Sequence, residues 1–294
     1  MMETLRFTLS FLPEKEENLS LALGNFDGCH KGHQRLFVET SLHAKGVAAA
    51  LFFSSPFQKG PYLSNVEDKV RYALVSRLDR LYVLENEASL FELTPEEFIQ
   101  KVLLPLGTKR VVVGEDFRFG KGGLGTPKTL EEYFDVDIVP LLYQEERKVS
   151  SSSIKEFLSL GQVVKASEYL GRSYEISGKV VTGLHNGEKL GYPTANIGLS
   201  FDYLLPRPGV YAGFIYIGGI AHKAMINVGD NPTIGKLDRP IVEVHILDYD
   251  EDCYGRFVYV GFLAYIREEI KFASLEELKK QLRVDEINVR EALS

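Results

Sequence analysis

The sequence contains no tryptophan and only two cysteines. Cys29 and Cys253 are separated by most of the 294 residues. A disulfide framework requires several cysteines at short spacings, so a disulfide-rich secreted protein is excluded. Two isolated thiols fit a reducing compartment, and we expect a cytoplasmic protein.

Long hydrophobic runs are also absent. A transmembrane helix needs about 20 consecutive apolar residues, and no segment approaches that length. Residues 1–10 mix charged and apolar side chains and lack the cleavage pattern of a signal peptide. We therefore expect no interaction with a membrane.

The sequence has no excess of positive charge. Its 34 Lys and Arg residues against 41 Asp and Glu residues give a net charge of −7. Proteins that bind nucleic acid generally need a basic surface, so we expect no nucleic-acid partner. Small-molecule substrates fit better, and any phosphate site must be locally basic or contain magnesium.

The apolar content is sufficient for more than one core. The chain is 45% hydrophobic, and its 294 residues exceed one ordinary domain. Two domains are therefore expected.

Strand and helix patterns alternate through the amino-terminal half. Apolar runs predict strands at Leu19–Leu23, Val47–Phe53, Leu81–Leu84, Arg110–Val113 and Val136–Val139. Helical patterns lie between them at Glu67–Leu78 and at Pro95–Leu104, which Thr94 is expected to cap. This alternation predicts a parallel, Rossmann-like α/β sheet that binds ligands beyond the carboxyl ends of its strands.

The most informative stretch is Gly24–His33, which follows the first of these strands and precedes a helical pattern near Leu36. Glycines let an anion approach the backbone, and free amides at the start of a helix favour phosphate. His30 and His33 can donate hydrogen bonds to phosphate oxygens without a metal. The stretch therefore predicts nucleotide phosphate binding.

Two other interpretations of this stretch stay open. The histidines could belong to a structural loop, although the surrounding glycines and Asp27 favour a binding site. A zinc site could use Cys29, His30 and His33, but tetrahedral zinc sites need further ligands, and no second Cys/His cluster is nearby.

Two later segments carry ligand-binding side chains. In the loop Gly114–Gly122, Asp116 can accept hydrogen bonds, Arg118 offers a planar cation, and phenylalanines can stack on an aromatic ligand. The segment Ser150–Lys155 begins a helix with hydroxyls and a cation, as in a second anion site. A solvated loop and a simple serine cap are the respective alternatives.

A different pattern begins at Glu175. Strand-like runs follow closely at Glu175–Val181, Gly209–Ile217, Ala221–Val228, Ile241–Leu247 and Arg256–Ile266. A helix at Leu275–Leu282, capped by Ser274, comes after them. The pattern predicts a small antiparallel β-barrel with a C-terminal helix. We expect domains at residues 1–160 and 173–294, joined by a linker at residues 161–172.

The stretch Gly24–His33 closely resembles the signature of the flavin-specific nucleotidylyltransferases, the amino-terminal half of bacterial bifunctional riboflavin kinase/FAD synthetases. The loop Gly114–Gly122 resembles the second signature of that family. Gly191-Tyr192-Pro193-Thr194-Ala195-Asn196 resembles the signature of the riboflavin kinase module. The resemblance spans nearly the whole chain and implies a nucleotidylyltransferase-type sheet domain followed by a kinase barrel.

In the adenylyltransferase half, the resemblance implies catalytic roles for His30, His33 and Lys155. Lys155 replaces a family arginine, so it keeps the charge but lacks the planar group that binds phosphate bidentately. The implied nucleotide contacts are Gly24, Phe26, Gly32, Ser150, Ser151 and Ser152, and the implied flavin contacts are Asn25, Asp116 and Arg118.

In the kinase half, the resemblance implies Thr194 and Asn196 as oxygen ligands of Mg²⁺ bound to ATP. Glu243 matches the family's general base, which accepts the proton of the riboflavin 5′-hydroxyl as its oxygen attacks the γ-phosphate. The implied nucleotide contacts are Gly187, Gly191 and Pro193, and Arg267 matches a flavin-contacting position.

The implied function is the synthesis of FMN from riboflavin and ATP, followed by the synthesis of FAD from FMN and ATP. Riboflavin, FMN and FAD are then substrates or products. Two alternatives remain: an adenylyltransferase with a carboxy-terminal module that only binds flavin, and a flavin-sensing regulator. Glu243, Thr194 and Asn196 argue against the first alternative, and the acidic composition argues against a regulator that contacts nucleic acid.

Overall fold

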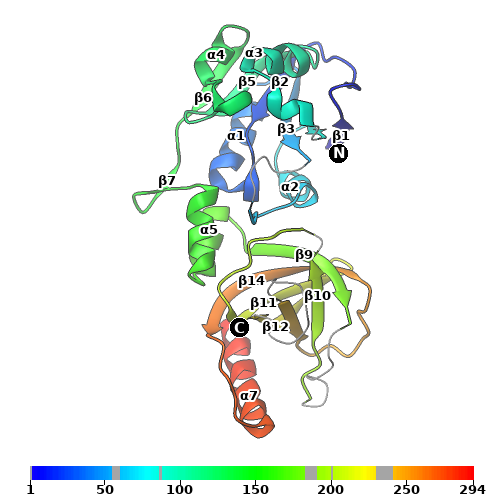
Figure 1. The fold of residues 1–294 in the computed structure, drawn as a ribbon, viewed down its shortest axis with the longest axis vertical. Coiled ribbons are helices and arrows are strands. Elements are labelled where there is room, and N and C mark those ends of the chain that lie inside the picture. The colour runs from blue at the N-terminus through cyan, green and yellow to red at the C-terminus, as the bar shows by residue number, and fades with distance from the viewer. Residues whose placement is uncertain (1, 55–59, 86–87, 183–190, 200, 230–240) are drawn as a thin grey trace. The chain divides into compact units, whose positions relative to one another are not determined.

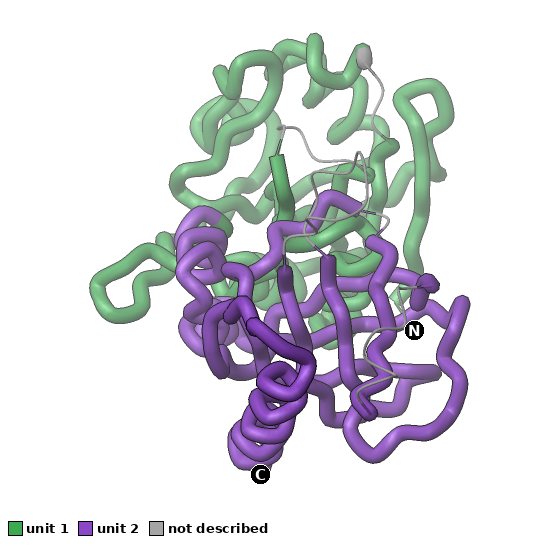
Figure 2. Tube along the Cα trace, turned by 60° about the horizontal axis from the view of Figure 1, so that its bottom comes forward, with its two compact units in different colours: residues 1–151 green, residues 152–294 purple. Residues whose placement is uncertain are grey.

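The computed structural model describes residues 2–54, 60–85, 88–182, 191–199, 201–229 and 241–294. The chain divides into two compact units, Met1–Ser151 and Ser152–Ser294, which Figure 2 shows in different colours. The first unit contains a six-stranded parallel sheet, and the second contains a closed six-stranded barrel and a C-terminal helix (Figure 1). This architecture confirms the predicted fold class.

The sheet of the first unit has the strand order β1-β4-β3-β2-β5-β6. The bounds are β1 Glu3–Phe7, β2 Leu19–Leu23, β3 Val47–Phe53, β4 Arg80–Leu84, β5 Thr108–Gly114 and β6 Asp135–Val139. Strand β1 is absent from the prediction because Glu3 and Arg6 interrupt its apolar pattern. Successive strands extend from β2 in one direction until β5 pairs on the other side, and such a reversal is where open α/β sheets bind ligands.

Short helices connect these strands. The bounds are η1 Asp27–Cys29, α1 Lys31–Leu42, α2 Val66–Ala73, η2 Ala88–Glu92, α3 Pro95–Phe98, η3 Ile99–Leu103, η4 Lys121–Gly123 and α4 Pro127–Glu131, and a hairpin of β7 Tyr143–Gln144 and β8 Arg147–Lys148 follows β6. Thr94 caps α3 as predicted. Helix α2 ends before the predicted Leu78 because the amide and the hydroxyl of Ser76 both donate to the Ala73 carbonyl.

The sheet is buried on both faces. In β3, Ala49 and Leu51 join one core cluster, while Ala50 and Phe52 join the cluster on the opposite face. Strands buried on both faces appear in sequence as continuous apolar runs, which is why the sequence identified them.

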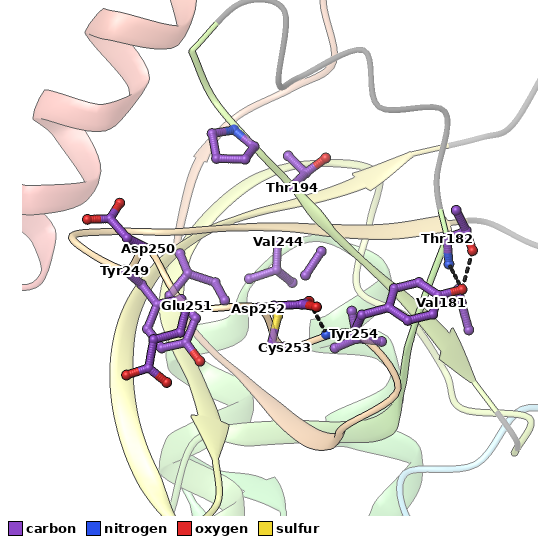
Figure 3. Close-up of a pocket in the computed structure, with 14 residues that line it drawn as sticks. Val181, Thr182, Thr194, Val244, Tyr249, Asp250, Glu251, Asp252, Cys253 and Tyr254 are labelled. Carbon is purple, nitrogen blue, oxygen red and sulfur yellow. Dashed lines mark hydrogen bonds between the residues drawn. The ribbon is translucent and has the colours of Figure 1, made fainter.

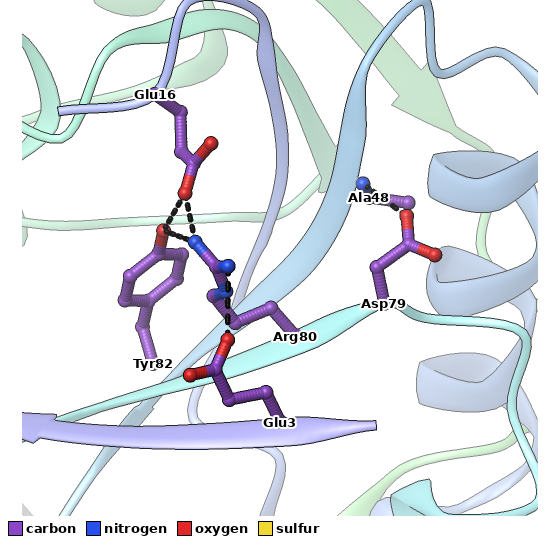
Figure 4. Close-up of polar contacts among 6 residues, drawn as sticks. All are labelled: Glu3, Glu16, Ala48, Asp79, Arg80 and Tyr82. Atoms are coloured by element: carbon purple, nitrogen blue, oxygen red, sulfur yellow. Dashed lines mark hydrogen bonds and ion pairs between the residues drawn. The ribbon is translucent and has the colours of Figure 1, made fainter. Parts of the chain in front are cut away.

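A polar cluster fixes the amino ends of β1 and β4 (Figure 4). Arg80 forms ion pairs with Glu3, at 2.9 Å, and with Glu16. The Tyr82 hydroxyl also donates to Glu16 at 3.5 Å. These residues lie at the edge of the sheet opposite to the carboxyl ends of its strands, so their role is structural.

The second unit is built around a closed antiparallel barrel with the order β10-β13-β12-β11-β14-β9. The bounds are α5 Ser151–Ser159, α6 Val163–Leu170, β9 Tyr174–Val181, β10 Ala195–Leu199, β11 Gly209–Ile217, β12 Ile220–Gly229, β13 Ile241–Ile246, β14 Phe257–Arg267 and α7 Leu275–Ala292. Ser274 caps α7 as predicted, accepting the Glu277 amide. Strand β10 was not expected, because its sequence overlaps the Gly/Pro/Asn-containing signature.

A buried ion pair joins α7 to the barrel. The Asp285 carboxylate is fully buried and accepts hydrogen bonds from Arg267 Nε at 2.8 Å and Nη2 at 2.6 Å. Gln281 donates a third hydrogen bond at 2.8 Å. The buried carboxylate therefore accepts three hydrogen bonds, two from the barrel and one from its own helix.

We expect Asp285→Ala to lower the free energy of unfolding of the second unit by about 3–5 kcal/mol, because it leaves the Arg267 guanidinium without its buried partner. A urea titration of the variant measures this loss. Asp248→Asn, which removes the charge of an exposed partner of Arg290 and still tolerates the positive φ at this position, is the matched control and should leave the midpoint nearly unchanged. Equal midpoints for the two variants would contradict the expectation.

Candidate active sites

The turn between β2 and α1 has an unusual backbone. Phe26, Gly28 and Cys29 have positive φ values of 53°, 77° and 41°. For Phe26 and Cys29 this conformation is strained, and such strain persists only where the surroundings enforce it. The surrounding structure must therefore hold this turn in its conformation.

The enforcing contacts come from distant segments of the chain. Asp27 is buried, and its Oδ1 accepts the amides of Leu63 at 2.9 Å and Ser64 at 3.2 Å. The Ser64 hydroxyl accepts the Gly28 amide at 2.7 Å, and Ser151 donates to the Asp27 main-chain oxygen at 2.8 Å. Asp27 thus acts as an anchor for the turn rather than as a ligand contact.

Two of the predicted glycines lie close to ring side chains. A Cβ atom on Gly32 would lie 3.1 Å from the His30 ring, and one on Gly24 would lie 3.0 Å from the Phe26 ring. These glycines therefore let the aromatic and imidazole rings pack directly over the turn.

The two histidines are brought together. His30 is the N-cap of α1, and its Nδ1 accepts the His33 amide at 3.4 Å. The imidazole rings stack with centroids 3.6 Å apart, and His33 also contacts the edge of Phe26 at 5.2 Å. Because Nδ1 of His30 accepts, its neutral ring carries the proton on Nε2 and can donate from that atom.

His33 is held in its neutral form. Burial lowers its pKa well below 6.5, and the nearby charges of His30 and Lys69 lower it further. Its Nδ1 atom is buried and has no hydrogen-bond partner among the described residues. A buried nitrogen without a partner is unusual in a folded protein and marks this turn as a candidate functional site.

The lowered pKa of His33 predicts an acid-sensitive stability. The unfolded chain binds a proton at this ring near pH 6.5, whereas the folded chain does so only at lower pH. The free energy of unfolding of the first unit should therefore fall by up to about 1.4 kcal/mol per pH unit as the pH drops from about 6.5. Urea titrations between about pH 5 and pH 8 should show that the free energy of unfolding of His33→Asn changes less steeply with pH.

His43→Asn is the matched control for this titration, since His43 lies at the end of the same helix with a half-exposed ring. Its slope should equal that of the unsubstituted chain. A wild-type slope in His33→Asn would refute the lowered pKa of this ring.

The cysteine of the turn does not join a metal site. The Cys29 thiol donates to the Phe26 carbonyl at 3.4 Å. Among the residues that the structure describes, no group of three or more His, Cys, Asp or Glu side chains is arranged to hold a metal ion. The zinc interpretation therefore has no support here.

A cavity of about 510 Å³ lies beyond the carboxyl ends of β2, β3 and β5. Among the predicted residues, Gly24, Asn25 and Arg118 line it. Its walls also include aromatic and aliphatic side chains that the sequence did not single out as ligand contacts: Leu90, Phe91 and Phe98. Phe117 and Phe119 stack with centroids 5.7 Å apart along the wall. The cavity has the size and the apolar lining that suit a planar aromatic ligand.

Asp116 does not line this cavity. Its exposed side chain forms an ion pair with Lys148. Its predicted contact with flavin therefore stays a prediction and would require a change of partner.

The serine segment is divided between the two units. Ser151 contacts the turn between β2 and α1 through Asp27 and is the first residue of α5. Ser152 and Lys155 belong to the second unit, with Lys155 one turn into the helix. Roles for Ser150, Ser152 and Lys155 at the phosphates stay predictions.

The strand register of the barrel brings two of the predicted kinase residues, Glu243 and Asn196, together. Glu243 on β13 lies directly opposite Asn196 on β10 and opposite Asn227 on β12. Directly opposed residues share a face of the sheet at about 5 Å. Burial raises the pKa of Glu243, while a hydrogen bond from the Asn227 side chain lowers it. A partly buried carboxylate with a raised pKa is suited to accept a proton.

A second cavity, of about 330 Å³, lies next to the signature segment (Figure 3). Pro193 and Thr194 line it together with a segment that sequence reasoning missed, Tyr249–Tyr254. His245, which neighbours Glu243 on the same strand face, bonds through Nδ1 to the Pro193 carbonyl at 2.8 Å and fixes this wall. Nothing periodic marks residues 249–254, so no sequence signal could have assigned them to a cavity.

The remaining predicted kinase residues differ in their placement. Gly191 has a φ of 82°, which favours glycine. The Arg267 guanidinium is bound by Asp285, so its predicted contact with flavin stays a prediction. Gly187 lies outside the described residues.

Both halves of the chain match known families. A family model for FAD synthetase matches residues 12–153, and one for riboflavin kinase matches residues 170–293. The bifunctional riboflavin kinase/FMN adenylyltransferase of Listeria monocytogenes is 33% identical over 288 residues, which cover 93% of this chain and 92% of that protein. The enzyme of the same name from Escherichia coli K12 is 33% identical over 311 residues, covering 99% and 97%.

A solved structure agrees over the same length. A crystal structure described as a macrolide-efflux protein from Streptococcus pneumoniae has a TM-score of 0.87 at 30% identity and covers 98% of this chain and 99% of its own. None of the helices described for the present chain has the length and apolarity needed to cross a membrane. Both units of this chain, rather than one alone, are therefore covered by a single known protein.

Proposed function

This chain belongs to the bifunctional riboflavin kinase/FMN adenylyltransferase family, and we propose that its two units catalyse successive steps of flavin cofactor synthesis. The second unit phosphorylates riboflavin to FMN, and the first unit adenylylates FMN to FAD. The observation that carries the proposal is the pairing of stacked His30 and His33 with an aromatic cavity at the carboxyl edge of the sheet. Match to the family over both halves supports it.

In the first unit, the phosphate oxygen of FMN attacks the α-phosphorus of ATP, and pyrophosphate leaves. No covalent enzyme intermediate is needed. The Nε2–H of His30 and the single N–H of neutral His33 donate to phosphoryl oxygens, on which charge increases in the transition state. The positive charge of Lys155 and the hydroxyls of Ser150, Ser151 and Ser152 are assigned to the same anion, and the aromatic cavity holds the flavin ring.

In the second unit, Glu243 accepts the proton of the riboflavin 5′-hydroxyl as that oxygen attacks the γ-phosphate of ATP. The Thr194 hydroxyl and the Asn196 carbonyl are hard oxygen donors of the kind that Mg²⁺ prefers, and Asn196 lies opposite Glu243. Magnesium, when bound with ATP, would neutralise charge on the phosphates. Gly191 and Pro193 border the nucleotide.

One incubation tests the proposal. Riboflavin, ATP and Mg²⁺ are supplied, and the products are separated by chromatography. FMN followed by FAD is the expected result. FAD formation only when FMN is supplied would leave the second unit as a flavin-binding module, and flavin binding without turnover would indicate a sensor.

Two free cysteines further fit a protein that works in the cytoplasm.

A further inference from the structure

Lys69 is a buried lysine that the roles above do not explain. It lies on α2, and 3% of its surface is exposed. Its ammonium donates to the main-chain oxygen of Asn25 at 2.9 Å. Lysine is almost never fully buried unless it is paired with an acid, so its position requires a physical reason.

No carboxylate contacts this ammonium within the described part of the chain. Its hydrogen bond is to the neutral main-chain carbonyl of Asn25. Asp27 attracts it electrostatically but uses Oδ1 for the amides of Leu63 and Ser64. An ammonium has three donor protons, so two of them have no acceptor among the described residues.

The buried charge lies close to the phosphate turn. Burial lowers the pKa of Lys69, whereas Asp27 and Cys29 raise it. The ammonium in turn lowers the pKa of His33, so it is within electrostatic reach of that imidazole. A buried cation without a contacting anion is costly, and an incoming anionic ligand would compensate it.

The hydrogen bond to Asn25 also sets the direction of the next amide. In a trans peptide the carbonyl and the following N–H point in opposite directions. Because the Asn25 carbonyl faces Lys69, the Phe26 N–H points away from it. That amide has no hydrogen-bond partner among the described residues, and Asn25 itself lines the aromatic cavity.

We propose that Lys69 is a positioning residue for adenylyl transfer, which turns the Phe26 amide toward the nucleotide phosphates and supplies the buried positive charge behind them. The inference rests on the proposed adenylyltransferase function. Lys69 acts through Asn25 and the strained turn, since it bonds to Asn25, which lines the aromatic cavity, and does not line that cavity itself.

The test is Lys69→Met, which keeps the length of the side chain but removes its charge and donors. We expect kcat for FAD formation from FMN to fall about 100-fold, with the KM for FMN and the riboflavin kinase rate of the same chain unchanged. Lys69→Arg, which restores a charge and donors, should recover at least about a tenth of kcat. Lys128→Met, an exposed lysine of α4, is the matched control and should behave like the wild type.

Equilibrium binding of pyrophosphate gives a second readout. Lys69→Met should bind pyrophosphate about tenfold more weakly and bind FMN normally, and Lys69→Gln should show the same loss if the methionine variant does not fold. Unchanged kcat, or a parallel loss of FMN binding and thermal stability that arginine does not rescue, would overturn the positioning role. A wild-type chain that makes no FAD from FMN would instead refute the underlying function.

Discussion

His33→Ala should lower kcat for FAD formation from FMN by about 100- to 1,000-fold. The imidazole is stacked on His30 at 3.6 Å and burial lowers its pKa, so it is held as a neutral ring at the position proposed for the phosphates. The cavity assigned to the flavin ring is lined by other residues, so FMN binding should change little. Steady-state kinetics and calorimetric titration with FMN measure the two effects separately.

His43→Ala controls for the loss of an imidazole from the same helix, because His43 lies at its far end with a half-exposed ring. This control should retain the wild-type kcat. Equal losses of turnover and of FMN affinity in His33→Ala would count against a transition-state role, since they would indicate a collapsed turn instead.

Glu243→Gln should lower the rate of riboflavin phosphorylation by about 100- to 10,000-fold. The amide keeps the shape of the carboxylate and its place between Asn196 and Asn227, but it cannot accept a proton. FAD formation from supplied FMN should continue at the wild-type rate, because that reaction belongs to the other unit. Chromatography of FMN and FAD from the two starting flavins measures both activities in one preparation.

Glu276→Gln is the matched control on the exposed first turn of α7 and should leave both activities intact. A Glu243→Gln chain that still makes FMN at the normal rate would remove this residue from the mechanism. Together, the His33 and Glu243 variants should separate the two activities completely, which neither a single-function enzyme nor a flavin sensor would allow.

The turn between β2 and α1 shows how much of a site the local sequence can predict. The sequence correctly predicted a strand that ends at Leu23, a turn that begins at Gly24, and a helix after the turn. The contacts that hold the strained turn come from Leu63, Ser64 and Lys69, and no spacing in the sequence links them to it. Polar contacts between distant segments leave no periodic signal, so they were not predicted.

The barrel shows the same limit. Alternation placed Glu243 and His245 on one strand face, as the structure has them. Which residues face Glu243 depends on the register with β10 and β12, and β10 was not expected at all. Register is fixed by pairing and core packing over the whole barrel, which local patterns do not contain.

The sequence by itself determined the succession of a parallel α/β sheet and a β-barrel, because burial on two faces or on one imposes different apolar patterns along a strand. Its glycines and histidines also located the turn at Gly24–His33, and its resemblance to the riboflavin kinase module located the signature at Gly191–Asn196. Only the tertiary structure decided that Asp27 and Arg267 are bound within the protein, that Leu90, Phe91 and Phe98 form a cavity wall, and that Lys69 lies beneath the turn. These features depend on contacts between residues that are far apart in the sequence. Such contacts are fixed by the packing of the whole folded chain and not by the local sequence.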